Sequence, residues 1–280
     1  MTLLLLLITI LLLALLAYRA LQRALRADPF KKRFQNLYPP SKTVTWLSRQ
    51  GRRPLLAHLY QPPDWHHTDK RPCIVLFFGG AWRVGSAWQF APFAARLCAL
   101  GAVVVLPEYR IKSRDRSTVE EAVVDGFTVI DKIRQSADCL GIDLARISVG
   151  GGSAGGHLAA WIATGRHPNG SHAADGFKPS SLLLFNPAVN FPIDASAYKG
   201  YSRRQKFSAR ALAKLSALDP MLHLESGHPD TLILHGDQDQ LVPVDKVEGY
   251  AAALQKQGAA VAMTIYPGRH HAFFNQTNSL

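Results

Sequence analysis

Short apolar runs bounded by turn residues recur along the chain, and stretches in which apolar residues have helical spacing separate them. Such runs are typical of strands that are buried on both faces of a sheet. The alternation predicts an α/β fold with a mostly parallel twisted sheet and helices on both faces. The predicted strands span residues 73–78, 103–106, 147–149, 182–185, 231–234 and 261–266.

Two further patterns add an edge and a helix to this sheet. Residues 43–60 are expected to form two antiparallel strands at its start. Thr118 and Glu121 have the spacing of a capping box, in which the two side chains satisfy backbone N–H groups at the start of a helix. Apolar residues then recur at helical spacing and predict a face packed on the core. These residues are Val119, Val123, Phe127 and Ile130.

The composition is that of a globular protein. The chain has 280 residues, of which 48% are hydrophobic and 19% are charged. This length is enough for one large core, so residues 43–280 are interpreted as a single domain. Cys73, Cys98 and Cys139 are widely spaced, odd in number and without metal-ligand spacing, so they are predicted to be buried free thiols.

The most informative motif is a serine between glycines, Gly151-Gly152-Ser153-Ala154-Gly155. It follows a run of strand character at residues 145–149 and precedes a helical stretch at residues 156–163. A serine on a strand-to-helix turn is typical of a nucleophile elbow, where glycines permit the tight turn and the helix N-terminus faces a developing anion. Ser153 is therefore a candidate nucleophile.

A serine nucleophile needs a base and a carboxylate, and candidates for both follow Ser153 along the chain. Asp237 and Asp239 come after the run at 231–234, and His270 and His271 come after the run at 261–266. The carboxyl ends of parallel strands meet at one edge of a sheet, so these side chains are expected near Ser153. The residues alone leave open which aspartate and which histidine act, because aspartate also favours turns.

Together these motifs resemble those of α/β-hydrolase-fold serine esterases of the hormone-sensitive-lipase-like and acetyl-esterase type. The resemblance covers residues 44–275 and includes Phe78-Gly79-Gly80-Ala81-Trp82, which is similar to the family's His-Gly-Gly-Gly oxyanion loop. It also includes Tyr109-Arg110 and the run at 140–147 that leads into the elbow. The resemblance implies an α/β-hydrolase fold.

The resemblance further implies a role for each matching residue. Ser153 would be the nucleophile and His271 the base. Asp239 would be the acid, since it matches the later aspartate of the family's His-Gly-x-x-Asp pattern. Asp237 then belongs to the turn, and His270 is a neighbour of the base.

The family's oxyanion donors correspond here to the backbone N–H groups of Gly80, Ala81 and Ala154. Each such donor contributes about 3 kcal/mol to the stabilisation of a transition state. Two positions depart from the family: Phe78 replaces a histidine before the glycines, and Gly152 replaces an acid before the serine. A subgroup that resembles carbohydrate acetyl-esterases shares both departures, so they are not interpreted as inactivation.

The predicted function is a serine hydrolase that cleaves short-chain carboxylic esters through an acyl-enzyme intermediate, with carbohydrate acetyl-esterase activity among those implied. An amidase or peptidase of the same fold is one alternative, because it would share the triad. A membrane-tethered binding protein on an inactive hydrolase fold is less favoured, because the full set of catalytic residues is present. No cofactor or metal is implied, since the sequence lacks a phosphate-binding glycine loop and metal-ligand spacings.

Between about residues 190 and 229 the strand–helix rhythm lapses, and the resemblance implies a small cap over the active site. Its aromatic and basic residues suit either a pocket wall for an anionic or sugar-like substrate or a solvated helix face, and the second is favoured. These residues are Tyr198, Lys199, Tyr201, Arg203, Arg204, Lys206, Phe207, Arg210 and Lys214.

Residues 1–18 form a separate hydrophobic segment, predicted to be a helix. The run from Leu3 to Ala17 is apolar except for Thr9, which is short for a membrane span and long for the core of a signal peptide. Only the α-amino group is basic before it, while arginines follow directly. A retained single-pass membrane anchor is therefore favoured over a cleaved export signal.

The charge distribution bears on location and partners. Residues 19–53 contain ten Lys or Arg and one acidic residue, which accounts for +9 of the net charge of +12. The remainder is nearly balanced, which argues against nucleic-acid binding. A basic juxtamembrane segment, residues 19–42, suits the anionic cytoplasmic membrane surface and places the catalytic domain on that side. An exported enzyme is the alternative, which a polysaccharide substrate would favour.

Overall fold

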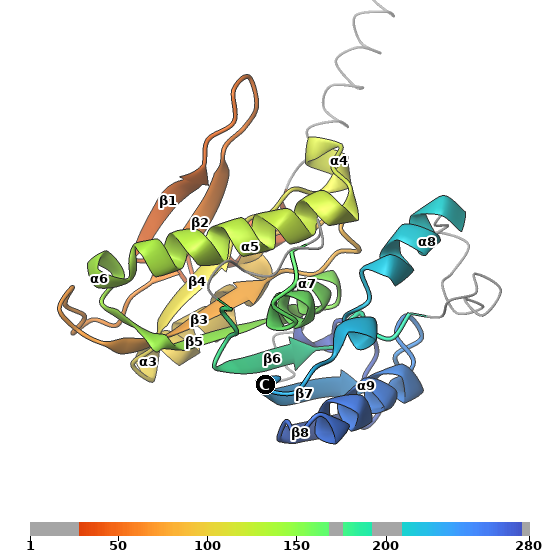
Figure 1. Ribbon diagram of the computed structural model, residues 1–280. Helices are drawn as coiled ribbons and strands as arrows, with labels where there is room; N and C mark the ends of the chain where they lie inside the picture. Colours follow the sequence, from red (N-terminus) through yellow and green to blue (C-terminus); the bar gives the residue numbers. More distant parts are fainter. Residues whose placement is uncertain (1–27, 168–175, 192–208, 276–280) are drawn as a thin grey trace, which may run out of the picture.

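An eight-stranded sheet forms the centre of the protein in the computed structural model, which describes residues 28–167, 176–191 and 209–275 (Figure 1). The strand order is β1-β2-β4-β3-β5-β6-β7-β8. β2 pairs antiparallel with both β1 and β4, and all other neighbours are parallel. The strands are β1 Lys42–Leu47, β2 Leu55–Tyr60, β3 Arg71–Phe77, β4 Val103–Pro107, β5 Ile142–Gly152, β6 Ser181–Phe185, β7 Asp230–Gly236 and β8 Val261–Tyr266.

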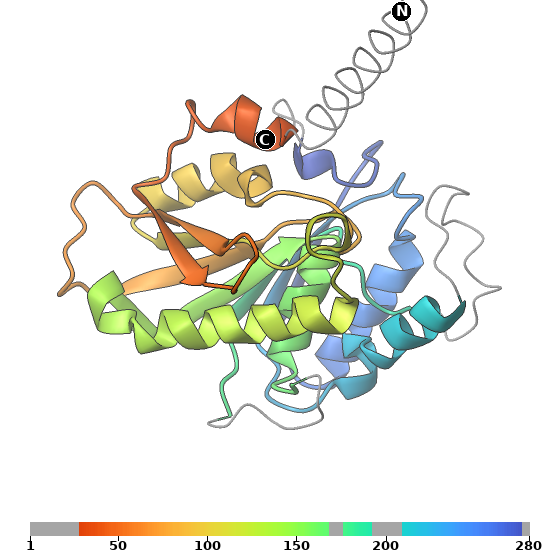
Figure 2. The ribbon, with the colours of Figure 1, turned by 90° about the horizontal axis from the view of Figure 1, so that it is seen from above.

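Helices lie on both sides of this sheet. Figure 2 shows α5 along one side, with α2 and α3 on the opposite side. The α-helices are α2 Pro29–Phe34, α3 Ala91–Ala99, α4 Lys112–Asp115, α5 Val119–Gln135, α6 Ala137–Leu140, α7 Ala154–Ala163, α8 Ala209–Ala217 and α9 Val244–Lys256. The described 3-10 helices are η1 Ala87–Phe90, η3 Pro220–His223 and η4 Phe273–Asn275.

The predicted mostly parallel sheet is confirmed, and every predicted strand corresponds to an observed one. The largest difference is in β5, which continues through the three glycines at residues 150–152. Their backbones pair with Leu183, Leu184 and Phe185 of β6. The strand therefore runs up to Ser153, so that the nucleophile candidate stands at the carboxyl end of a central strand.

The helix predicted after Thr118 is also present as α5. Thr118 and Glu121 form the capping box with both reciprocal bonds. Val123, Phe127 and Ile130 are buried in the core, as their helical spacing predicted. α5 follows β4 by way of residues 108–118, and Figure 1 shows that it lies across one side of the sheet.

In the described part of the chain, helices cover the two faces of the sheet unevenly. Leu232 of β7 is 38% exposed although it lies within the parallel part of the sheet. Its register neighbours are Leu183 of β6 and Ala262 of β8. The prediction of helices on both faces therefore holds for the centre of the sheet, while one face of β6–β8 stays partly open in the described part of the chain.

Of the predicted cap, residues 190–191 and 209–229 are described, and they include α8 and η3. Asp219, which is 2% exposed, joins the two ends of this insertion: its carboxylate accepts hydrogen bonds from the backbone N–H groups of Asn190, Phe191 and Met221. Lys214 forms an ion pair of 2.8 Å with Glu120 of α5, which agrees with a solvated helix face at that position. The other aromatic and basic residues predicted to form either a pocket wall or a solvated face lie outside the described side chains.

The predicted N-terminal helix, residues 1–18, lies outside the described residues. Of the basic segment that follows, residues 28–42 are described and include α2, which Asp28 caps through the Lys31 N–H. Within the described ranges, none of the helices has both the length and the apolar character that crossing a membrane requires.

The cysteine prediction needs one correction. All three cysteines are free thiols, and Cys73 and Cys98 are buried, but Cys139 is exposed. Cys139 belongs to the four-residue helix α6 after α5, where the chain turns at the surface before it enters β5. The expectation rested on the spacing and number of the cysteines, which do not show whether a side chain lies at a surface turn.

Candidate active site

Ser153 stands on a sharp turn between β5 and α7, with φ of 51° and ψ of −116°. This left-handed φ is strained for a residue with a side chain, and such strain is typical of functional positions. The glycines around it are required by close approach of the backbone. A Cβ at Gly151 would lie 2.4 Å from the Phe77 carbonyl oxygen, and one at Gly155 would lie 2.1 Å from the same atom. The elbow therefore packs directly against the end of β3.

Three side chains from three strand ends form a continuous hydrogen-bonded line. His271 Nε2 lies 2.9 Å from Ser153 Oγ, and His271 Nδ1 lies 2.7 Å from Asp239 Oδ2. Ser153 follows β5, Asp239 follows β7, and His271 follows β8. The structure thus brings together the serine, the histidine and the aspartate to which the resemblance assigned the triad roles.

Asp239 is held firmly in its orientation. Its Oδ1 accepts the backbone N–H groups of Leu241 and Val242, each at 2.9 Å, and its Oδ2 accepts Asn186 Nδ2 at 2.9 Å. Burial by itself would raise the pKa of Asp239, but the hydrogen bond and charge of His271 and the amide of Val242 outweigh burial and lower the pKa. The carboxylate is therefore ionised and accepts the Nδ1–H of His271.

The neighbouring candidates take other roles. The Asp237 carboxylate accepts the Gly268 N–H at 2.7 Å in the turn after β8. His270 is exposed, and its Nδ1 lies 3.0 Å from the Gln238 carbonyl oxygen. Both side chains join the loops after β7 and β8 to each other. They stabilise the frame that carries Asp239 and His271.

Two of the three predicted oxyanion donors belong to residues that line the pocket beside Ser153, and the third belongs to the first residue of α7. Gly80 and Ala81 line the pocket with Ser153 and His271. Ala154 is the first residue of α7, where helical N–H groups have no partner within the helix. Within the described chain, none of these three N–H groups donates to another residue. The arrangement leaves them available to an oxyanion bound at Ser153.

The pocket beside Ser153 has a volume of about 390 Å³, near the small end of the range for ligand sites. Its walls are mainly apolar, and Arg83 lies at its exposed rim. The apolar wall residues are Ala81, Trp82, Val84, Ala188, Leu241, Ala272 and Phe274. The pocket suits a small acyl or alkyl group next to a serine nucleophile. Within the described ranges, no three His, Cys, Asp or Glu side chains gather as metal ligands, and the lack of a cofactor stays a prediction.

The two departures from the family have structural explanations. Phe78 stacks on Tyr109 with ring centroids 4.1 Å apart, and both side chains are fully buried. A Cβ at Gly152 would lie 2.2 Å from the Phe274 ring, so the ring occupies the space that an acid before Ser153 would need. The usual histidine and acid are thus replaced by aromatic packing.

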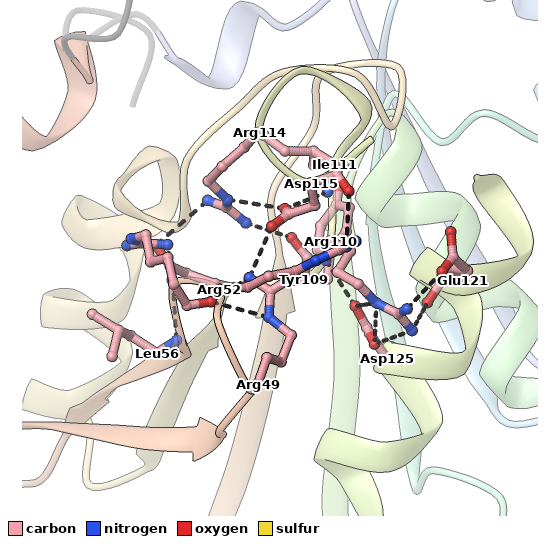
Figure 3. Close-up of polar contacts among 12 residues, drawn as sticks. Arg49, Arg52, Leu56, Tyr109, Arg110, Ile111, Arg114, Asp115, Glu121 and Asp125 are labelled. Carbon is pink, nitrogen blue, oxygen red and sulfur yellow. Dashed lines mark hydrogen bonds and ion pairs between the residues drawn. The ribbon is translucent and has the colours of Figure 1, made fainter. Parts of the chain in front are cut away.

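An ion network connects residues 110–115, which follow β4, with neighbouring arginine and acidic side chains (Figure 3). Asp115 accepts hydrogen bonds from Arg49, Arg114 and the backbone N–H of Ile111. Arg110 makes a paired contact with Asp125 and also reaches Glu121, both of α5. The network therefore ties the β1–β2 turn to the segment that follows β4.

That segment in turn supports the loop. The backbone N–H groups of Lys112 and Ser113 donate to the carbonyl oxygens of Trp82 and Arg83, each at 2.9 Å. The family resemblance included Tyr109-Arg110 without indicating a role. The structure shows that this segment is the support of the predicted oxyanion loop.

Sequence reasoning missed Asn186 and the buried histidines around the site. Asn186 directly follows β6, so its position at a strand end was an available signal. His235 Nε2 lies 3.0 Å from the Val242 carbonyl oxygen, and burial lowers the pKa of His235, so it is neutral beside Asp239. His157 of α7 packs edge-on against Trp82 at 5.0 Å and donates from Nε2 to the Leu218 carbonyl.

His157 makes folding sensitive to acid. Complete burial lowers the pKa of His157 to about 4, whereas an unfolded histidine has a pKa of about 6.5. Between these values the unfolded chain binds more protons, so the free energy of unfolding falls as the pH falls through this window. Between pH 7 and pH 4.5 the free energy of unfolding of His157→Leu should fall by about 2 kcal/mol less than that of the wild type. Urea unfolding at the two pH values measures this difference.

The control for this prediction is His66→Leu, because His66 is exposed. It should show the same loss of stability with acidification as the wild type. Other buried histidines contribute to the total, so the difference between wild type and variant is the quantity to compare. Equal pH dependence in His157→Leu and the wild type would contradict the prediction.

Comparison with known proteins places this geometry among hydrolases. A family model described as alpha/beta hydrolase fold matches residues 74–275. A thermophilic esterase from Thermogutta terrifontis, solved with propionate bound, has a TM-score of 0.73 and 31% sequence identity to this chain. The superposition covers 86% of this chain and 88% of the esterase.

Two curated relatives extend the comparison. The esterase LipQ of Mycobacterium tuberculosis is 28% identical over 236 residues, which cover 80% of this chain and 55% of LipQ. A probable isoprenylcysteine alpha-carbonyl methylesterase of Oryza sativa subsp. japonica is 27% identical over 232 residues, which cover 76% of this chain and 53% of the relative. The chain therefore spans about half the length of these curated relatives.

Proposed function

The chain belongs to the α/β-hydrolase fold family, and from this membership and its Ser153–His271–Asp239 line we propose that it is a serine esterase. The family resemblance indicated by the elbow and by residues 78–82 is thereby confirmed. The observation that carries the proposal is the pair of short contacts at His271, 2.9 Å to Ser153 Oγ and 2.7 Å to Asp239 Oδ2. These contacts suit Ser153 as nucleophile, His271 as base and Asp239 as the carboxylate that orients the base.

In the proposed reaction, Ser153 Oγ attacks the ester carbonyl carbon while His271 Nε2 takes the hydroxyl proton. The carbonyl oxygen becomes an anion that accepts hydrogen bonds from the N–H groups of Gly80, Ala81 and Ala154. Collapse of this intermediate breaks the bond to the alcohol, which receives the proton from His271 and leaves an acyl group on Ser153. Water then attacks the acyl carbon with His271 as base again, and the carboxylic acid and free Ser153 are released.

We propose short acyl chains as the preferred substrates. The small apolar pocket supports this choice. The Thermogutta terrifontis esterase, whose fold is similar, has been solved with propionate and with butyrate bound. The alcohol part is less constrained, so the proposal includes acetylated carbohydrates as candidate substrates, and the panel should contain them beside p-nitrophenyl esters and a p-nitroanilide.

Covalent labelling tests the proposal. A fluorophosphonate probe should label the folded wild-type chain, because the probe reacts with an activated serine, and Ser153→Ala should not be labelled. Turnover of p-nitrophenyl acetate should accompany labelling and fall as the acyl chain lengthens to octanoate. A folded wild-type protein that is not labelled would contradict the esterase proposal, and preferential cleavage of the anilide would favour an amidase.

We also propose that residues 1–18 tether the enzyme to a membrane, with the catalytic domain on the cytoplasmic side. The apolar run and the ten basic residues of the following segment, residues 19–53, support this proposal. The labelled band can be followed through fractionation of expressing cells. It should sediment with membranes, whereas a chain without residues 1–18 should not, and protection of the domain from protease added outside the cells would agree with the cytoplasmic side. Recovery of the full chain in the culture medium would instead indicate an exported enzyme.

A further inference from the structure

Each predicted oxyanion donor shares a peptide plane with a carbonyl group. The described chain has no cis peptide, and in a trans peptide the C=O and N–H bonds point in opposite directions. Whatever binds the carbonyl on one side of the plane therefore also sets the direction of the N–H on the other side. The direction of each donor can thus be followed to the group that holds its partner carbonyl.

Backbone groups hold two of the three planes. The Gly80 carbonyl, which shares a plane with the Ala81 N–H, accepts the N–H groups of Arg83 and Val84, each at 3.0 Å. These bonds close a tight turn inside the loop itself. A side-chain substitution would leave both of them in place.

The plane of the Ala154 N–H is also held by backbone groups. The Ser153 carbonyl shares a plane with the Ala154 N–H and accepts the N–H groups of His157, at 3.0 Å, and Ala188, at 3.1 Å. The first of these is a helical bond of α7. The direction of the Ala154 N–H is therefore built into the elbow.

The Gly80 N–H differs, because a side chain holds its plane. Gln89 Nε2 donates to the Gly79 carbonyl at 3.3 Å, and Gln89 Oε1 accepts the Gly79 N–H at 2.8 Å. Gln89 is 7% exposed and belongs to η1, ten residues after Gly79. One amide group therefore fixes both peptides that flank Gly79, including the one that carries the Gly80 N–H.

A second buried side chain holds the same segment from the other side. The Tyr109 hydroxyl donates to the Phe78 carbonyl at 2.8 Å, and that carbonyl shares a plane with the Gly79 N–H bound by Gln89. Side chains therefore bind both polar groups of the peptide between Phe78 and Gly79. Tyr109 is fully buried, and its own carbonyl accepts Arg114 of the ion network.

The loop needs such external support. Ala81 and Trp82 have φ values of 53° and 57°, a left-handed conformation that is strained for residues with side chains. The loop also lacks a histidine at position 78. Without bonds from outside, the strained segment could relax and turn the Gly80 N–H away from the pocket.

We propose that Gln89 is a positioning residue that aims the Gly80 N–H at the oxyanion, with Tyr109 as its counterpart on the opposite side of the loop. The inference rests on the proposed esterase function, because it concerns the oxyanion site of that reaction. Gln89 and Tyr109 support the loop, which has Phe78 at the position where the family has a histidine.

Gln89→Met is the main test, because methionine has a similar length and fills the buried space without making either hydrogen bond. Removal of one oxyanion donor typically lowers kcat by about 100- to 1,000-fold, so misdirection of one donor should lower kcat by about 10- to 100-fold. KM should change less than about threefold, since the interaction forms only in the transition state. Steady-state kinetics with p-nitrophenyl acetate measures both constants.

An inhibitor that resembles the intermediate separates positioning from general damage. A trifluoromethyl ketone forms an adduct with an active serine whose oxygen occupies the oxyanion site. Its affinity should fall in Gln89→Met by the same factor as kcat/KM, whereas the affinity of the matching methyl carbinol, which forms no adduct, should stay unchanged. Ile133→Ala is the matched control, because Ile133 is buried near the end of α5 that leads to the start of β5, whereas Ser153 follows the opposite end of that strand. It should lower the thermal unfolding midpoint with little effect on kcat.

Amide hydrogen exchange provides a readout that does not depend on activity. The Gly79 N–H donates to Gln89, so its exchange should become faster in Gln89→Met while exchange within β3 stays slow. Tyr109→Phe serves as the second variant if Gln89→Met does not fold. It should lower kcat by about 3- to 10-fold, again with KM nearly constant, because one of the two grips on the loop remains.

The outcomes separate the two proposals. An active wild type with unchanged kcat, ketone affinity and Gly79 exchange in Gln89→Met would overturn the positioning role and leave the esterase proposal intact. A fall in kcat with unchanged ketone affinity would also overturn it. A wild type without labelling or turnover would contradict the esterase proposal. In that case, unchanged Gly79 exchange in Gln89→Met would independently overturn the positioning role of Gln89.

Discussion

Replacement of His271 by alanine is expected to lower kcat for p-nitrophenyl acetate by about 10⁴- to 10⁶-fold, because members of a triad act as a unit. His271 Nε2 is 2.9 Å from Ser153 Oγ, so it is positioned to take the proton of the attacking hydroxyl. Without it the serine has no base, and the residual rate comes from the oxyanion donors and from binding alone. KM should change far less than kcat, and steady-state kinetics on purified folded protein measures both.

The adjacent histidine offers a matched control. His270→Ala should keep kcat within about threefold of the wild type, because His270 is exposed and contacts the Gln238 carbonyl rather than Ser153. The pair also tests a choice that the residues alone left open. A severe loss in His270→Ala with a mild effect in His271→Ala would mean that the base is wrongly assigned.

Asp239→Asn is expected to lower kcat by about 10⁴-fold. Oδ1 of Asp239 accepts two backbone N–H groups, from Leu241 and Val242, so an asparagine would place its oxygen there. Its NH₂ group would then face His271 Nδ1, which would have to become the acceptor. The proton would move to Nε2, and the imidazole could no longer accept the proton of Ser153 Oγ.

Asp237→Asn is the corresponding control. An asparagine oxygen can still accept the Gly268 N–H, so activity should stay within about threefold of the wild type. Thermal unfolding midpoints of both variants show whether any loss of activity reflects loss of the fold. Comparable activity losses at the two positions would contradict the assignment of Asp239 as the triad carboxylate.

Much of the fold could be predicted because its signals are local. The central strands β3 and β4 have continuous apolar runs, because strands covered on both faces need apolar side chains at nearly every position. The capping box of α5 is also local, as Thr118 and Glu121 satisfy each other's backbone groups within one turn. Such patterns depend on a few consecutive residues, so they are visible without a structure.

The candidate site was predictable for a related reason. Ser153, Asp239 and His271 each follow a predicted strand, and parallel topology brings strand ends together. The choice of Asp239 and His271 over their neighbours came from the family resemblance. Their distances to one another depend on loop conformations that no local pattern specifies.

Other features could not be predicted, because their partners are far apart in sequence. Asn186 reaches Asp239 across 53 residues, and the Tyr109 hydroxyl reaches the Phe78 carbonyl across 31. Gly152 read as the loss of a supporting acid, whereas the structure shows that the Phe274 ring leaves no room for a side chain there. Cys139 was wrongly placed inside because the surface turn at α6 was not recognised.

The sequence by itself determined the order of strands and helices, the elbow and the set of residue types needed for a serine hydrolase, because each of these depends on short-range patterns. Only the tertiary structure decided how Ser153, His271 and Asp239 meet and how Gln89 and Tyr109 hold the oxyanion loop. The physical reason is that hydrogen bonds and close packing require positions within a few tenths of an ångström. Distances of that accuracy arise from the packing of the whole sheet and its loops.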